Sequence, residues 1–277
     1  MKKKNLISKL VEEGILVIAT IIMMLPIYYL VIGAFKSRRD IIQNPLALLP
    51  EMFTVDNFPY VIKKMDYWSA LGNTLFITVM ALLIVIVFAS LAGFAVARIR
   101  SKLFSGYYSM LVTLMVIPFI GCLLPLATQS VQMNLYDNIW GCILIQAAWN
   151  MPFCVFLYAG FMKGVPKELE EAAYLDGCST LGVYARVFLP LLAPTTATCC
   201  IRQGVGIWND YLVTRTLLNE NKTPTLMVGI NGFFGERANE LGYAFAGILL
   251  VSIPMVIMFL FLQKYFIKGI AAGAVKG

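Results

Sequence analysis

Long stretches with almost no charge dominate this chain. A segment needs about 20 mostly apolar residues to cross the hydrocarbon core of a bilayer. Stretches of this length cover residues 14–35, 71–97, 103–129, 138–162, 187–209 and 241–262, and only the fifth contains a charge, Arg202. With 60% hydrophobic and 13% charged residues, the chain cannot cover a soluble globule with an ordinary polar surface. The sequence therefore predicts an all-α integral membrane protein with six transmembrane helices.

Basic residues at the ends of these stretches predict the orientation. Cytoplasmic loops are enriched in Lys and Arg. An N-terminus in the cytoplasm places most of the basic residues there, although Arg38 and Arg39 then fall on the opposite side. We expect a multi-pass protein of the cell membrane with both termini in the cytoplasm. Its parts are a tail over residues 1–13, a membrane domain over 14–263 and a second tail over 264–277.

Composition also limits the chemistry and the partners. The net charge of +7 fits the orientation and contact with anionic lipid headgroups, and gives no reason to expect a nucleic acid partner. The chain has no His, no GxxxxGK[ST] phosphate loop, no GxGxxG and no GxSxG. Its six Cys lack CxxC spacing and are expected to be small buried apolar residues. We predict no catalytic residue, metal site or cofactor, and no ATP hydrolysis by the chain itself.

A short charged passage, KELEEAAYLDGCSTLGVYARVFLP, interrupts the apolar stretches at residues 167–190. Pro166 suits the start of a helix, and carboxylates in the first turns favour the positive end of the helix dipole. Gly177 permits the left-handed backbone that ends a helix, and Ser179 can cap a second one. The passage therefore predicts a helix, a sharp turn and a second helix. Such a unit suits docking into a groove of another protein, and the alternative is an ordinary amphipathic loop.

The spacing of this passage resembles the EAA loop of permease subunits in binding-protein-dependent ABC importers. The resemblance rests on Glu171-Ala172-Ala173, Gly177 and the ending Val187-Phe188-Leu189-Pro190. Further segments resemble the carbohydrate-uptake class of the maltose-transporter type, and its smaller second permease subunit in particular. These segments are residues 73–75 (NTL), 92–98 (AGFAVAR), 150–153 (NMPF), 208–210 (WND) and 269–277 (GIAAGAVKG). Cys178 and the pair Arg202-Gln203 depart from the usual pattern.

The resemblance implies the function and the partners. It implies a permease, not an enzyme, that forms with a second homologous permease the path for a sugar or related solute: an oligosaccharide, a monosaccharide, a polyol or glycerol phosphate. An extracellular solute-binding protein delivers the solute, and a dimer of cytoplasmic ATP-binding subunits drives transport. The EAA loop, residues 163–190 between helices four and five, would enter a cleft of the ATPase. The expected coupling residues are Glu168, Glu171, Ala172, Ala173, Asp176, Gly177, Leu189 and Pro190.

Arg202 and Gln203 stand out in the middle of the fifth stretch. A charged Arg near the bilayer centre costs at least about 2.5 to 3.5 kcal/mol on insertion scales, so it should face the interior of the helix bundle. In one interpretation the pair only holds neighbouring helices together. In the other it lines the solute path and donates hydrogen bonds to hydroxyl, carboxylate or phosphate groups. The expected path residues are Asn150, Arg202, Gln203, Trp208 and Asn209.

Prolines should interrupt two spans: Pro118 and Pro125 in the third, and Pro152 in the fourth.

The alternative function is a self-contained secondary transporter. Such a protein needs acidic residues inside the membrane for ion coupling, and none lies deep in a predicted span.

Overall fold

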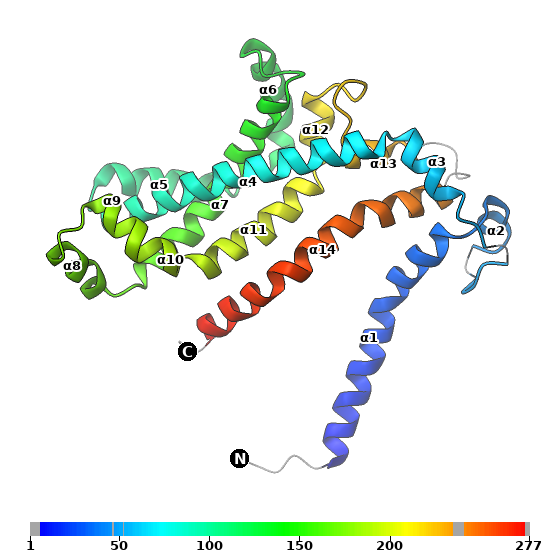
Figure 1. The fold of residues 1–277 in the computed structure, drawn as a ribbon, viewed down its shortest axis with the longest axis horizontal. Coiled ribbons are helices and arrows are strands. Elements are labelled where there is room, and N and C mark those ends of the chain that lie inside the picture. Colours follow the sequence, from blue (N-terminus) through cyan, green and yellow to red (C-terminus); the bar gives the residue numbers. More distant parts are fainter. Residues whose placement is uncertain (1–5, 46, 52, 235–240, 275–277) are drawn as a thin grey trace. The chain divides into compact units, whose positions relative to one another are not determined.

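The computed structural model describes residues 6–45, 47–51, 53–234 and 241–274 (Figure 1). The regular structure in these residues is helical, apart from one β-bridge between Lys36 and Phe53. This confirms the predicted all-α class. The chain forms two compact units, Met1–Tyr67 with Gly229–Ile253, and Trp68–Val228 with Pro254–Gly277.

The first unit contains α1 (Leu6–Ala34), α2 (Arg38–Gln43), α3 (Asn57–Lys64) and the first part of α14 (Leu241–Ala274). Helices α1 and α14 approach closely at Gly33, where an added Cβ would lie 2.5 Å from the ring of Phe245. Buried Asn57 donates to the backbone carbonyls of Ala34 (2.8 Å) and Lys36 (3.0 Å). This amide therefore fixes the chain where α1 ends.

The second unit contains α4 (Tyr67–Arg98), α5 (Lys102–Leu114), α6 (Phe119–Gln132), α7 (Ile139–Lys163) and α11 (Ala193–Trp208). Its core includes the fully buried side chains of Tyr158, Met162 and Phe188. Helices α4 and α7 are in close contact at Gly93, where an added Cβ would lie 2.7 Å from Cβ of Tyr158. The short helices α12 (Leu212–Leu217) and α13 (Leu226–Asn231) follow α11.

Four helical segments are long and apolar enough to cross a membrane: Ser8–Ala34, Tyr67–Arg98, Ile139–Lys163 and Leu241–Phe261. Two bent pairs add two more if each counts as one span. One is α5 with α6, bent by 108°, and the other is Thr180–Leu191 with α11, bent by 70°. The described residues therefore hold between four and six candidate spans.

Of the three prolines expected to interrupt spans, Pro118 does so, whereas Pro125 and Pro152 do not. Pro118 has an extended backbone (φ −65°, ψ 124°) directly before α6, and a proline disfavours helical geometry in the residue before it. The kink expected there is thus a complete break between α5 and α6. Pro125 lies inside α6 and Pro152 inside α7, and both helices continue through them.

The terminal helices are longer than the predicted spans. Helix α1 begins at Leu6, inside the tail predicted over residues 1–13. Helix α14 runs to Ala274, through most of the tail predicted over residues 264–277. Residues 1–5 and 275–277 of these tails lie outside the described residues.

Candidate functional site

The charged passage folds as the sequence predicts, with α8 (Lys167–Leu175) followed by a tight turn. Gly177 has a φ of +81°, the left-handed conformation that a glycine adopts at lowest cost. The amide of Gly177 donates to Tyr174 O and the amide of Cys178 donates to Ala173 O, both at 3.0 Å. This pair of bonds is the Schellman motif, which satisfies the last carbonyls of a helix and reverses the chain.

A second short helix begins directly after the turn. Ser179 precedes α9 (Thr180–Val183), and its hydroxyl accepts from the amide of Gly182 at 3.2 Å. The chain continues through a π-helical turn, η1 (Tyr184–Phe188), and α10 (Leu189–Leu191). Inserted π-turns in proteins often occur at functional sites. We refer to residues 163–190, the segment expected from the sequence to contact an ATPase, as the coupling loop.

Most of the coupling residues expected from the sequence are exposed. Ala173 is buried against the core, whereas the exposed ones are Glu168, Glu171, Ala172, Asp176, Gly177, Leu189 and Pro190. Two leucines that the sequence analysis missed flank the turn: Leu175 is 90% exposed and Leu181 is 70% exposed. Their signal in the sequence was an apolar residue on either side of a glycine turn in a charged passage. The loop thus presents acidic side chains and an apolar tip.

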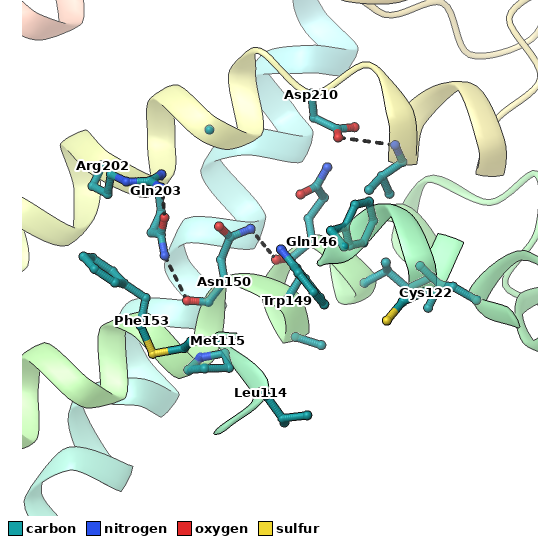
Figure 2. A pocket seen from close by; sticks show the side chains of 17 residues that line it. Leu114, Met115, Cys122, Gln146, Trp149, Asn150, Phe153, Arg202, Gln203 and Asp210 are labelled. Carbon is teal, nitrogen blue, oxygen red and sulfur yellow. Dashed lines mark hydrogen bonds between the residues drawn. The ribbon is translucent and has the colours of Figure 1, made fainter. Parts of the chain in front are cut away.

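A cavity of about 570 Å³ lies in the same unit, between α5, α6, α7 and α11 (Figure 2). Of the residues expected to line the solute path, Asn150, Arg202 and Gln203 line this cavity. Trp208 and Asn209 are not among its lining residues: Trp208 is buried, and Asn209 is exposed at the end of α11. The structure therefore brings together three of the five expected path residues.

Arg202 and Gln203 differ in burial and in hydrogen bonding. Buried Gln203 donates from Nε2 to Asn150 O at 3.1 Å, and Asn150 donates from Nδ2 to Gln146 O at 2.7 Å, so an amide chain joins α11 to α7 (Figure 2). Arg202 is exposed, and it donates one long bond to Gln203 Oε1 at 3.4 Å. Its guanidinium lies 5.8 Å from the ring centre of Phe153. Since a guanidinium has five N–H donors, Arg202 retains capacity for a ligand.

The far side of the cavity carries polar groups that the sequence analysis missed. Asp210 accepts from the amides of Val213 (3.3 Å) and Thr214 (2.9 Å) and so caps α12. Burial raises the pKa of Asp210, while these amides and the nearby Gln146 amide act in the opposite direction. Gln146 Nε2 is buried beside this carboxylate but makes no hydrogen bond of normal length and angle within the described chain. Nothing in the sequence pattern indicated that Gln146 would face the same space as Asp210.

Aromatic side chains complete the lining. Trp149 and Phe119 contact each other edge to face, with ring centres 4.6 Å apart, and both face the cavity together with Phe153. In Figure 2, Trp149 lies next to Asn150 and below Gln146 and Asp210. The cavity therefore offers a cation, a carboxylate, free amide donors and flat apolar rings in one space.

Comparisons with known proteins agree with this architecture. The chain is similar to the melibiose/raffinose/stachyose import permease protein MelC of Bacillus subtilis (strain 168), with 38% identity over 254 residues and 91% of each chain covered. It is similar to the arabinooligosaccharides transport system permease protein AraQ of Halalkalibacterium halodurans, with 31% identity over the full length of both. It shares its fold with a chain of a bacterial ABC transporter involved in the import of the acidic polysaccharide alginate. That match has a TM-score of 0.81 and 23% identity and covers 96% of this chain and 99% of the other.

The family match covers most of the chain, including the coupling loop and the cavity helix α11. Residues 86–272 match the family described as "Binding-protein-dependent transport system inner membrane component". A component of such a system works with a binding protein and an ATPase, and this chain carries no phosphate loop of its own. The chain belongs to the family of inner membrane components of binding-protein-dependent transport systems.

Proposed function

We propose that this chain is one of two homologous permeases in an ABC importer for a sugar or oligosaccharide, and that the coupling loop connects it to the ATPase. The turn at Gly177 is the observation that carries this proposal: a left-handed glycine between two capped helices, in the charged passage of an otherwise apolar chain. The names of MelC and AraQ support an oligosaccharide as the solute class. A glycerol phosphate or polyol is the second candidate, favoured by the unused donors of Arg202.

The surface of the coupling loop suits a groove on a partner protein. Glu168 and Glu171 are exposed on α8, where they can pair with basic residues of an ATPase. Leu175 and Leu181 flank the turn and offer apolar area that docking would remove from water. The Schellman bonds hold the turn in one conformation, so docking costs little ordering of the loop.

This function requires a particular topology. We propose six spans, with each bent pair crossing once, and both termini in the cytoplasm. Basic side chains near the end of α4, the start of α5 and the end of α7 support this side as cytoplasmic: Arg98, Arg100, Lys102 and Lys163. The same side then holds the coupling loop. Lipid surrounds the outer faces, as the exposed apolar side chains of α1 suggest.

The cavity is the proposed solute path within this subunit. Sugars present many hydroxyl groups, which need both donors and acceptors, and faces of C–H groups that pack on aromatic rings. Arg202 and Gln146 supply donors, Asp210 supplies an acceptor, and Trp149 supplies a flat surface. Gln203 and Asn150 hold the wall in place. We leave Trp208 and Asn209 out of the path because neither lines the cavity.

A substitution at Gly177 tests the coupling function. A Cβ on Gly177 meets no atom within 4 Å, but the β-branched side chain of Gly177→Val opposes a φ of +81° and adds bulk at the turn. The complete importer should lose uptake and solute-stimulated ATP hydrolysis while the permease still inserts into the membrane. Full transport by Gly177→Val would show that this loop does not couple the subunit to the ATPase.

The second permease can be tested by leaving it out. This chain with the ATPase and binding protein alone should give no uptake in proteoliposomes, and adding the homologous permease should restore it. Full uptake without the second permease would show that the chain works as a homodimer.

A further inference from the structure

Arg98 is a buried cation at the last residue of α4. Its side chain is only 5% exposed. A buried charge is costly unless hydrogen bonds and opposite charges surround it. The sequence alone indicated only a basic residue at a membrane boundary. The burial and the partners of Arg98 are seen only in the structure.

The partners of Arg98 come from three neighbouring parts of the chain. Its Nη2 donates to Met162 O and Val165 O, both at 2.7 Å, where α7 ends. Its Nε lies 3.5 Å from Glu170 Oε2 on α8. Its guanidinium lies 4.8 Å from the ring centre of Phe188, at the end of η1. One side chain on α4 thus contacts the end of a membrane helix and both ends of the coupling loop.

These contacts differ in tightness. The two bonds to the end of α7 are short, and carbonyls at a helix C-terminus attract a cation. The contact with Glu170 is longer, and Arg98 Nε makes no hydrogen bond within the described chain. Glu170 is also 17% exposed. Arg98 is therefore fixed to α7, while its own contact with α8 is a single, longer ion pair.

The face of α4 that carries Arg98 contacts η1 at two further points. Ser90 Oγ and Tyr184 Oη lie 2.7 Å apart, and the rings of Phe94 and Phe188 are 5.1 Å apart. Positions 90, 94 and 98 are spaced by four residues, so they share one face of the helix. The close contact between α4 and α7 at Gly93 makes independent movement of these two helices costly. A displacement of the loop against this face would therefore act on both.

We propose that the Arg98–Glu170 ion pair is the link through which movement of the coupling loop reaches α4 and α7. Arg98 is a positioning residue in this scheme: it acts through α8 and contacts neither solute nor nucleotide. The proposal rests on the coupling function proposed above. It specifies the contact through which movement of the coupling loop is transmitted to the membrane helices.

The test uses the complete importer in proteoliposomes with three variants. Glu170→Gln removes the charge at nearly unchanged volume, Arg98→Lys keeps a cation but loses the two-pronged donor geometry, and Arg100→Gln is the exposed control in the same turn. Bound ATPase, basal ATP hydrolysis, solute-stimulated ATP hydrolysis and uptake are measured. Glu170→Gln and Arg98→Lys should retain bound ATPase and basal hydrolysis, while stimulation falls by roughly fivefold or more, the low end of typical coupling between sites. Arg100→Gln should behave as the wild type.

A double variant distinguishes a shared link from two separate effects. If the two residues act together, the loss in Arg98→Lys with Glu170→Gln should be smaller than the sum of the two single losses, and additive losses would overturn the proposal. Wild-type stimulation in Glu170→Gln would also overturn it, and this variant decides the question if Arg98→Lys fails to assemble. Gly177→Val in the same assay separates the two proposals. If Gly177→Val uncouples and Glu170→Gln does not, only the link is wrong; if Gly177→Val transports normally, the coupling function itself is wrong.

Discussion

The coupling loop and the cavity lie in the same compact unit but are assembled differently. The loop takes its turn, its caps and its exposed tip from one continuous run of residues, 163–190. The cavity takes its lining from the end of α5, the first half of α6, the middle of α7, α11, Asp210 and the start of α12. Local hydrogen bonds hold the loop, whereas the cavity depends on how separate helices pack. We therefore expect changes in the loop to affect binding of the ATPase, and changes in the cavity to affect which solute is carried.

The largest effect should come from the apolar tip of the loop. Leu175→Asp places a charge where a 90% exposed leucine is expected to enter the ATPase groove. Loss of a buried interface anchor costs 2 kcal/mol or more, which is roughly thirtyfold or more in affinity. Co-purification of the ATPase with the permease should fall accordingly, with membrane insertion unchanged. Lys167→Gln, an exposed change on the same helix, is the control.

Retention of the ATPase by Leu175→Asp would place the docking surface elsewhere on the loop. The acidic side of α8 would then be the first region to examine, beginning with Glu171.

The second prediction separates Arg202 from Gln203. Arg202→Gln removes an exposed cavity donor, and hydrogen bonds to a charged group contribute about 1.5 to 3 kcal/mol, so uptake affinity should fall roughly tenfold or more with complex abundance unchanged. Gln203→Ala removes the buried bond between α11 and α7 and should lower complex abundance instead. Uptake kinetics normalised to assembled complex measure both. If uptake of Arg202→Gln falls only in proportion to abundance, Arg202 is structural.

The difference between the two regions also explains what sequence reasoning achieved. Gly177, Ser179 and Pro166 have local preferences for particular backbone positions, so the helix, turn and helix of the loop followed from the sequence. Arg202 was identified because a charge in an apolar span has few permitted surroundings. Gln146 and Asp210 were not identified, because their meeting depends on the packing of α7 against the end of α11, which no local pattern encodes.

The helix breaks also combine a feature that the local sequence predicts with one that depends on packing. The interruption at Pro118 was predictable, because a proline removes an N–H donor and restricts the residue before it. Its size was not: the 108° bend between α5 and α6 depends on the packing of both helices. The burial of Arg98 was hidden for a similar reason, since a basic residue at a span end is ordinarily expected at the membrane surface.

The third prediction concerns Asp210. Burial raises its pKa, so the folded chain binds this proton more tightly than the unfolded chain does, and ionisation of Asp210 lowers stability as the pH rises through the raised pKa. Asp210→Asn removes that cost and keeps a capping side chain for α12. The purified complex should therefore be at least as thermostable as the wild type at pH 7.5. This difference in thermostability should shrink as the pH falls toward the ordinary pKa of an aspartate.

Transport should change in the opposite direction. Asn is a weaker acceptor for solute hydroxyls than a carboxylate, so Asp210→Asn should reduce uptake by a few-fold, about 1 kcal/mol in binding. Thr128→Val is a control, because Thr128 bonds only within α6 and does not line the cavity. A loss of thermostability in Asp210→Asn at pH 7.5 would show that the ionised carboxylate stabilises α12 by more than its burial costs.

The smallest effect should come from the cap of α9. Ser179→Ala removes the bond from the Gly182 amide and costs about 1 kcal/mol of local helix stability, while the Schellman turn before it stays intact. Because the turn alone fixes the direction of the chain, solute-stimulated ATP hydrolysis should fall by no more than roughly twofold. Ser101→Ala is the matched control, since Ser101 caps α5 with a bond of the same length, 3.2 Å, outside the loop. Equal losses in both variants would mean that general helix stability, not the coupling loop, limits transport. A larger loss in Ser179→Ala alone would show that α9 takes part in docking, so that the contact surface extends past the turn toward Leu181.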